Sequence, residues 1–352
     1  MIRADLDLLP GSADDPDATA PAPPSRGVRA RRSASNPLGQ QPFPPLAAAA
    51  VPSWARASGR AGQGDPLFFA AAGLTLLDAF LRRDPPAAGA LRQRLALISA
   101  AASAKILRVN AAEGALRDLR FAMGDDPGPA ARLLRLWREL ASRPPSLDAG
   151  RLATAAGLLD LALPDPNGLA SSLKDCAGDG DPVSAAGKSA ALVFSAFPDA
   201  PAAEAEILAL WLFDLALAIR LRWLRPLPLI ATKVLDPALR PRDGGRRPRP
   251  GELGWASTAA EAIALAAASA LDLAADLSRR TEVLLAVAPK LRAKPAAKIV
   301  DLLLAEDCVS PAEAARQAPM TDRAARRLFD RLVALGAARE LSGRPTFRLY
   351  GL

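Results

Sequence analysis

Residues 295–352 read PAAKIVDLLLAEDCVSPAEAARQAPMTDRAARRLFDRLVALGAARELSGRPTFRLYGL. Apolar residues recur at helical spacing over residues 296–304, which predicts a first helix there. The string SPAE at residues 310–313 is a capping box with proline at the first helical position, so it predicts the start of a second helix. Thr321 is a favourable N-cap for a third helix that ends at Leu335.

A hairpin is predicted after the third helix. Gly336 supplies the left-handed conformation that commonly ends a helix. Residues 338–341 and 346–350 alternate between apolar and polar side chains, and the string SGRP at 342–345 is a turn signal. Three short helices followed by a hairpin are the sequence pattern of a winged helix-turn-helix, which we therefore predict for residues 290–352.

The predicted third helix has two chemically different faces. Its apolar residues fall on one stripe, whereas its arginines fall largely outside that stripe and are expected to face solvent. Helix-turn-helix modules present such arginines to phosphates and guanine edges in the major groove, so we predict contacts with double-stranded DNA. The predicted DNA-binding residues, four on the helix and two on the hairpin, are Arg323, Arg326, Arg327, Arg331, Arg344 and Arg348.

Basic residues are concentrated in two regions of the chain. The sequence has 45 Lys and Arg against 37 Asp and Glu, a net charge of +8. Residues 290–352 contain 12 basic and 7 acidic residues, and residues 220–249 contain 9 basic and 2 acidic residues. Clustered cations suit a polyanionic partner because phosphate binding releases condensed counterions. Two alternatives to DNA binding remain open. The arginines are only solvated side chains on an ordinary packed helix, or the winged helix binds a protein.

The second basic region includes a predicted exposed loop at residues 236–251, which is rich in proline and glycine. Its charges suit non-specific phosphate contacts, and the equally open alternative is a solvated insertion. The arginines of this loop are Arg240, Arg242, Arg246, Arg247 and Arg249.

The predicted fold class is mainly α. Residues 1–50 are rich in proline and alanine and are predicted to be a disordered tail. Residues 51–289 are predicted to form an irregular helical bundle, because aspartate or proline stands at nearly every helix start and no fixed-period repeat is present. The helices of this domain are expected at residues 66–82, 87–109, 112–122, 126–142, 148–162, 183–197, 202–225 and 256–288.

Composition argues against most catalytic sites. The chain has no histidine, the residue on which acid-base triads and most zinc sites depend. Cys176 and Cys308 stand far apart and are expected to be small buried thiols. Gly187-Lys188-Ser189 lacks the earlier glycine of a phosphate-binding loop. We therefore predict no enzymatic activity, no cofactor and no metal.

Apart from the proline-rich residues 33–55, no stretch of eighteen residues is free of charge, and the first residues lack the features of a signal peptide. We therefore expect a cytoplasmic protein without a membrane span. Asp78, Asp160 and Asp214 interrupt apolar helical stretches and are expected to pair with arginines such as Arg92, Arg94 and Arg222. The tryptophans expected in the core are Trp137, Trp211 and Trp223.

Six strings of the sequence carry a family resemblance. They are VPSWA at 51–55, LRQRLAL at 91–97, GDDPGPA at 124–130, ILALWL at 207–212, LLAVAPKLR at 284–292 and RPTFRLYGL at 344–352. Through them the chain resembles a bacterial family, domain-of-unknown-function family 1403, over residues 51–352. The resemblance implies no activity, so the functional prediction rests on the residues: a DNA-binding protein acting as a transcriptional regulator or DNA-maintenance accessory. The alternative is a non-catalytic helical adaptor.

Overall fold

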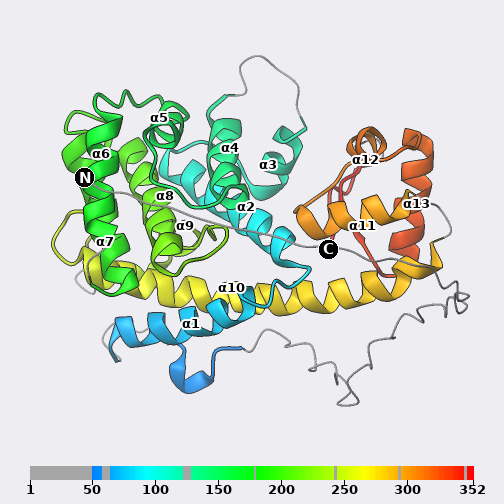
Figure 1. Ribbon diagram of the computed structural model, residues 1–352, viewed down its shortest axis with the longest axis horizontal. Helices are drawn as coiled ribbons and strands as arrows, with labels where there is room; N and C mark the ends of the chain where they lie inside the picture. Colours follow the sequence, from blue (N-terminus) through cyan, green and yellow to red (C-terminus); the bar gives the residue numbers. More distant parts are fainter. Residues whose placement is uncertain are drawn as a thin grey trace, which may run out of the picture. The chain divides into compact units, whose positions relative to one another are not determined.

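The computed structural model describes residues 50–57, 64–121, 128–177, 180–241, 244–291, 295–344 and 347–352. The described residues form thirteen α-helices and a single two-stranded sheet, which confirms the mainly α fold class. They lie within one unit that extends from Pro44 to Leu352 (Figure 1). The predicted disordered tail, except for Ala50, falls outside the described residues.

Ten α-helices precede the C-terminal segment. They are α1 (Pro66–Leu81), α2 (Ala88–Ile106), α3 (Glu113–Leu119), α4 (Gly128–Ser142), α5 (Ala149–Gly157), α6 (Pro166–Ala177), α7 (Pro182–Ala196), α8 (Ala202–Arg220), α9 (Ile230–Lys233) and α10 (Trp255–Val287). The C-terminal segment contains α11 (Ala296–Ala305), α12 (Pro311–Gln317), α13 (Asp322–Ala334), β1 (Arg339–Glu340) and β2 (Tyr350–Gly351).

Aspartate followed by proline starts several of these helices. Asp65 accepts a hydrogen bond from the Leu67 amide, and Asp181 accepts one from the Val183 amide. Each carboxylate satisfies an amide that has no partner within its helix, while proline takes the position where an N–H is not needed. The same pair at Asp165-Pro166 starts α6, a helix that the sequence analysis missed.

The longest helix, α10, is a core helix along which other helices pack. Helix α1 lies alongside it, and the two backbones approach so closely that a Cβ on Gly73 would lie 2.8 Å from the Ala267 Cβ (Figure 1). The stretch Trp255–Lys290 is long and apolar enough to cross a membrane, with a mean hydropathy of 1.4 over eighteen residues. However, 61% of that window is buried inside the protein, which is typical of a core helix.

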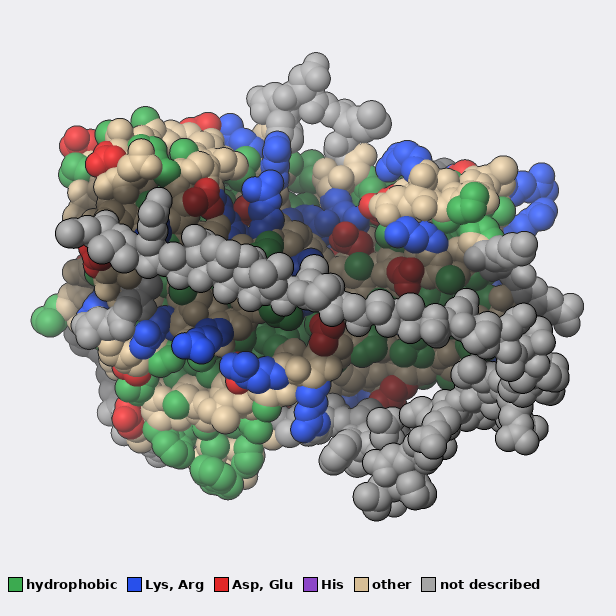
Figure 2. All heavy atoms as spheres, viewed as in Figure 1, with side chains coloured by type: hydrophobic (Ala, Val, Ile, Leu, Met, Phe, Trp, Pro, Cys, Tyr) green, Lys and Arg blue, Asp and Glu red, His purple; other side chains and the backbone are tan. Residues whose placement is uncertain are grey.

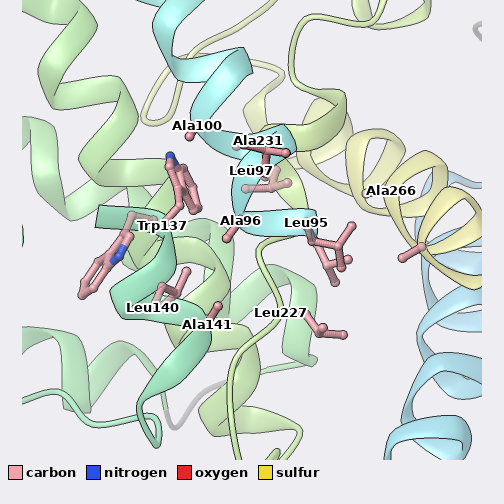
Figure 3. Close-up of a cluster of buried hydrophobic side chains, with 14 of the residues drawn as sticks. Leu95, Ala96, Leu97, Ala100, Trp137, Leu140, Ala141, Leu227, Ala231 and Ala266 are labelled. Carbon is pink, nitrogen blue, oxygen red and sulfur yellow. The ribbon is translucent and has the colours of Figure 1, made fainter. Parts of the chain in front are cut away.

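A second layer of the core lies between α2 and α4. Trp137 and Leu140 from α4 lie against Ala96 and Ala100 from α2 (Figure 3). Trp137 is fully buried, and its Nε1 donates a hydrogen bond to the Ser103 Oγ at 2.9 Å. Small residues on α2 therefore make room for the large ring, and the ring's one polar atom is satisfied. The structure confirms that the three predicted tryptophans are buried.

The three aspartates within apolar helical stretches have different partners from those expected. Asp78 pairs with Arg82 and Asp160 pairs with Arg132, so arginine was the right class of partner but the named residues were wrong. Among the described residues, Asp214 has no arginine partner. Its fully buried carboxylate accepts hydrogen bonds from the Leu229 amide at 2.8 Å and the Ile230 amide at 3.2 Å, at the start of α9.

We predict that Asp214→Ala destabilises the protein by about 2–4 kcal/mol, because two buried amides lose their acceptor. Asp214→Asn keeps one acceptor oxygen and is expected to lose roughly half as much. Urea unfolding followed by circular dichroism measures both values. As a control, Asp301→Ala removes an exposed carboxylate on α11 and is expected to change stability by less than about 0.5 kcal/mol. Equal losses for the 214 and 301 variants would contradict the assigned role.

Candidate nucleic-acid interface

The C-terminal helices begin and end where the sequence predicts. The Ser310 Oγ accepts a hydrogen bond from the Glu313 amide at 3.1 Å, and the Thr321 Oγ1 accepts one from an amide of α13 at 3.2 Å. Gly336 has a φ of +68° and ends α13. One detail of the predicted capping box is wrong: the Glu313 carboxylate does not return to the cap but pairs with the Arg120 guanidinium at 2.8 Å.

A short antiparallel ladder follows α13. Strands β1 and β2 pair with Glu340 opposite Tyr350, and Tyr350 also pairs with Val309 through two backbone hydrogen bonds of 2.7 and 2.9 Å. Both strands are shorter than predicted. Residue 345 of the predicted turn and residue 346 of the second predicted strand lie outside the described residues. The ladder links the segment before α12 to the end of the chain.

Helix α13 buries one face and exposes the other. Ala325, Phe329 and Leu332 are buried, and the Phe329 ring stacks on the Tyr350 ring with centroids 4.5 Å apart. The opposite face carries arginines at a spacing of four residues, which places them on one side of the helix. This outward stripe consists of Arg323, Arg327 and Arg331.

The six predicted DNA-binding arginines differ in their partners. Within the described ranges, no residue forms an ion pair or a side-chain hydrogen bond with the arginines of the outward stripe. The other three are paired: Arg326 with Asp322 at 2.8 Å, Arg348 with Asp330 at 3.4 Å and Arg344 with Asp118 at 2.7 Å. Figure 2 shows Lys and Arg side chains at the outer edge of the region where Figure 1 places α13.

A hollow of about 280 Å³ lies on one flank of α13. Asp322, Arg326, Asp330 and Arg348 line it together with Tyr350 and Phe347. The carboxylates and guanidinium groups there belong to the two local ion pairs, so this flank carries mixed charge. The outward stripe, in contrast, carries only positive charge.

The arginines of the loop at residues 236–251 are largely used within the protein. Arg247 and Arg249 both bind the carboxylate of Glu206, which is only 2% exposed. Arg246 binds Glu252 at 2.6 Å and lowers the pKa of that carboxyl to about 2. The expectation of a simply exposed loop is therefore wrong for Arg247 and Arg249, because a buried acid on α8 fixes them. Of the remaining two, Arg240 is exposed and Arg242 lies outside the described residues.

A buried carboxylate fixes the C-terminal segment to the helical body. Asp307, between α11 and α12, is 5% exposed and binds the guanidinium groups of Arg94 on α2 and Arg117 on α3. Burial raises the pKa of Asp307, but the two arginines outweigh burial and hold that pKa below its ordinary value. Asp307 is therefore ionised and doubly compensated in the folded protein.

Further arginines of the body extend this cluster. Arg120 donates a hydrogen bond to the Cys308 carbonyl oxygen and pairs with Glu306 at 3.2 Å and with Glu313. Arg138 on α4 also binds Glu306, at 2.9 Å. We call the acids Glu306, Asp307 and Glu313 with the arginines Arg94, Arg117, Arg120 and Arg138 the docking cluster. Its four arginines come from three helices of the body, so it fixes the orientation of α11–α13.

Close backbone contacts reinforce the docking cluster. A Cβ on Gly89 of α2 would lie 2.7 Å from the Ala305 Cα, and a Cβ on Gly351 would lie 2.5 Å from the Asp307 carbonyl oxygen. Real side chains do not tolerate such distances, so glycine is required at both positions. At Gly89 the body and the C-terminal segment therefore pack backbone to backbone as well as through charge, and Gly351 holds β2 close to Asp307 within the segment.

A family model described as "Protein of unknown function (DUF1403)" matches residues 46–352. The chain belongs to the DUF1403 family. The match includes the helical body, the docking cluster and α13, so all of the elements described above lie within the family's domain. A search of curated proteins found no match to the chain.

The docking cluster of this DUF1403 chain was not found by sequence reasoning. Arg94 was expected to pair with an aspartate inside the body, but its partner Asp307 lies 213 residues away in the sequence. The cysteines were both expected to be buried, yet only Cys308 is, while Cys176 is partly exposed. Burial and the neighbouring Asp307 raise the pKa of the Cys308 thiol to about 11. The thiol of Cys308 is therefore protected and can report on undocking.

We predict that Asp307→Asn loosens the C-terminal segment of this DUF1403 chain, because removing one partner of a buried ion pair costs about 3–5 kcal/mol. In a Cys176→Ser background, alkylation of Cys308 should accelerate roughly 100-fold or more, as measured by mass spectrometry. The matched control Asp301→Asn should alkylate at the parent rate. An unchanged rate in the 307 variant would show that the docking cluster does not hold the segment in place.

The lowered pKa of Asp307 also predicts a pH dependence. The stability that Asp307 provides is present above its unfolded pKa of about 3.9 and is lost as the pH falls through the lower folded value. The stability difference between the parent protein and Asp307→Asn should therefore shrink below about pH 4. Urea unfolding at pH 7, 5 and 3 measures this difference, and a constant difference would contradict the prediction.

Proposed function

We propose that residues 295–352 form a winged helix-turn-helix that binds double-stranded DNA through α13. The order of three helices followed by a two-stranded ladder supports this architecture. The backbone pairing of Val309 with Tyr350 adds a third extended segment between the first and second helices. In this proposal α12 and α13 are the helix pair, and the segment between β1 and β2 is the wing.

The observation that carries the proposal is the outward stripe of α13. Arg323, Arg327 and Arg331 lie on the side opposite the buried face, and no described residue neutralises them. Four helical residues rise about 6 Å, so the three guanidinium groups are spread along about 12 Å of the helix. This arrangement suits a helix in the major groove, with guanidinium groups directed to phosphates and guanine edges.

The paired arginines have a secondary role in the proposal. Arg344 and Arg348 lie on the wing and are assigned phosphate contacts that exchange an existing carboxylate partner for the DNA backbone. Arg326 would likewise exchange its carboxylate partner, Asp322, for the DNA backbone. The loop at residues 236–251 is left outside the proposed interface, since Arg247 and Arg249 bind the buried carboxylate of Glu206, which cannot be left unpaired at low cost. The proposed protein is a non-catalytic regulator or DNA-maintenance accessory of the cytoplasm.

A second candidate function is an adaptor that binds another protein through the same module. Val333 and Leu335, at the end of α13, are 38% and 43% exposed and give this end of the helix an apolar character. Protein-binding surfaces commonly combine apolar centres with charged rims. Co-purification of one stoichiometric protein that resists nuclease treatment would favour this adaptor over the DNA-binding protein.

We predict that changing Arg323, Arg327 and Arg331 together to alanine abolishes most duplex affinity. If three phosphates are neutralised, log affinity of the parent should fall with log salt at a slope of about −3, and the triple variant should bind at least about 100-fold more weakly with a flatter slope. Fluorescence anisotropy with a mixed-sequence 30-base-pair duplex at several salt concentrations measures both quantities.

The matched control removes three exposed arginines elsewhere: Arg135, Arg143 and Arg279 to alanine. This control has the same net charge as the test variant and is expected to keep near-parent affinity and slope. Equal losses of duplex affinity in the two variants would show that binding depends only on net charge. A parent protein that binds no duplex even at low salt would rule out the proposed function.

A further inference from the structure

The end of α1 and the end of α8 meet beside the first turns of α2. The Arg82 Nη2 donates a hydrogen bond to the Leu221 carbonyl oxygen at 3.3 Å, and the Trp223 Nε1 donates one to the Asp78 Oδ1 at 3.0 Å. These two bonds tie the turn between α1 and α2 to the loop between α8 and α9. Helix α2, which follows that turn, packs against both α8 and α9, the two helices that the loop connects.

Unpaired arginines gather at this junction. Arg82 is already paired with Asp78 at 2.7 Å. Four more arginines lie in the turn, on α2 or in the loop, and within the described ranges none of them has an ion pair or a side-chain hydrogen bond. These four are Arg83, Arg92, Arg222 and Arg225. We call them the junction arginines.

Arg92 is the most constrained of the junction arginines. It is partly buried, and its Nε–H is shielded from solvent without a hydrogen-bond acceptor. Burial lowers the pKa of Arg92, and the nearby Arg225 guanidinium lowers it further, while Asp84 acts in the opposite direction. The Asp84 carboxylate therefore raises the pKa of Arg92 but forms no ion pair with it. The Arg92 guanidinium therefore lies in a cationic environment with a buried donor that has no acceptor, an arrangement that a bound anion would stabilise.

The backbone at the junction is also unusual. Arg222 has a φ of +54° and ends α8 in the left-handed conformation, with the Trp223 amide donating to the Ala218 carbonyl oxygen at 2.9 Å. Glycine is the preferred residue at such a position. An arginine there places a cationic residue in the loop at the junction instead of the residue that the backbone would favour.

We propose that Arg92 and Arg225 form a binding site for a phosphate-class oxyanion on the helical body, with Arg83 and Arg222 at its rim. Guanidinium groups bind phosphate in a planar, bidentate manner, and the Nε–H edge of Arg92 has a donor without an acceptor. Four junction arginines and the single carboxylate of Asp84 leave a local charge of +3, which suits a phosphate dianion. The site lies on the helical body and does not depend on the proposed role of α13.

The test is thermal unfolding of the full chain with 10 mM inorganic phosphate, pyrophosphate or acetate, each compared with sodium chloride at the same ionic strength. We expect phosphate or pyrophosphate to raise the Tm of the parent by about 2–4 °C and acetate to leave it unchanged. Arg92→Met and Arg225→Met should lose this shift. In phosphate-free buffer Arg225→Met should melt no lower than the parent, because it relieves the repulsion of Arg92.

Two controls separate the site from other effects. Arg143→Met removes an exposed arginine directly after α4 and should keep the full phosphate shift. The triple variant Arg323→Ala, Arg327→Ala and Arg331→Ala should also keep it, so failure of DNA binding and failure of this site are distinguishable. The exposed loop position of Arg225 makes its variant informative even if Arg92→Met fails to fold. A parent Tm that responds equally to phosphate and chloride would overturn the proposal, as would an Arg225→Met variant with the parent's shift.

Discussion

The buried carboxylate of Asp307 is the interaction on which the arrangement of the C-terminal segment depends. It binds Arg94 from α2 and Arg117 from α3, so one acid connects two helices of the body to the loop between α11 and α12. A buried charge with two cationic partners is costly to expose or to leave half-paired. Arg120 and Arg138 repeat the same pattern with Glu306 and Glu313, which makes the contact a network.

Docking in this way has a consequence for α13. Glu306, Asp307 and Glu313 of the segment neutralise arginines of the body. The arginines of the outward stripe lie on the side of α13 opposite its buried face and have no acidic partners among the described residues. The separation gives the segment one face that holds the body and another that is free for a polyanion. Fixing the orientation of α13 also lowers the entropy cost of presenting three guanidinium groups together.

Local features were predictable from the sequence, and long-range ones were not. Helix starts can be predicted from capping residues, because a cap acts within three residues of the chain. The capping residues concerned are Asp65, Asp181, Ser310 and Thr321. The buried and exposed faces of α13 follow from helical periodicity for the same reason. In contrast, nothing near Asp307 or Asp214 identifies a guanidinium from α2 or the amides of α9 as the partner, since tertiary packing brings these groups together. The loop arginines illustrate the same gap, because the buried Glu206 that binds two of them lies about forty residues earlier on α8.

Hydrogen exchange of the full chain with and without a DNA duplex tests the central claim most directly. The account predicts that duplex slows exchange in α13 and around the segment between β1 and β2, leaves the loop at residues 236–251 unchanged, and finds the Glu306–Cys308 segment protected in both states. Protection confined to the loop or to the helical body, with α13 unaffected, would contradict the account.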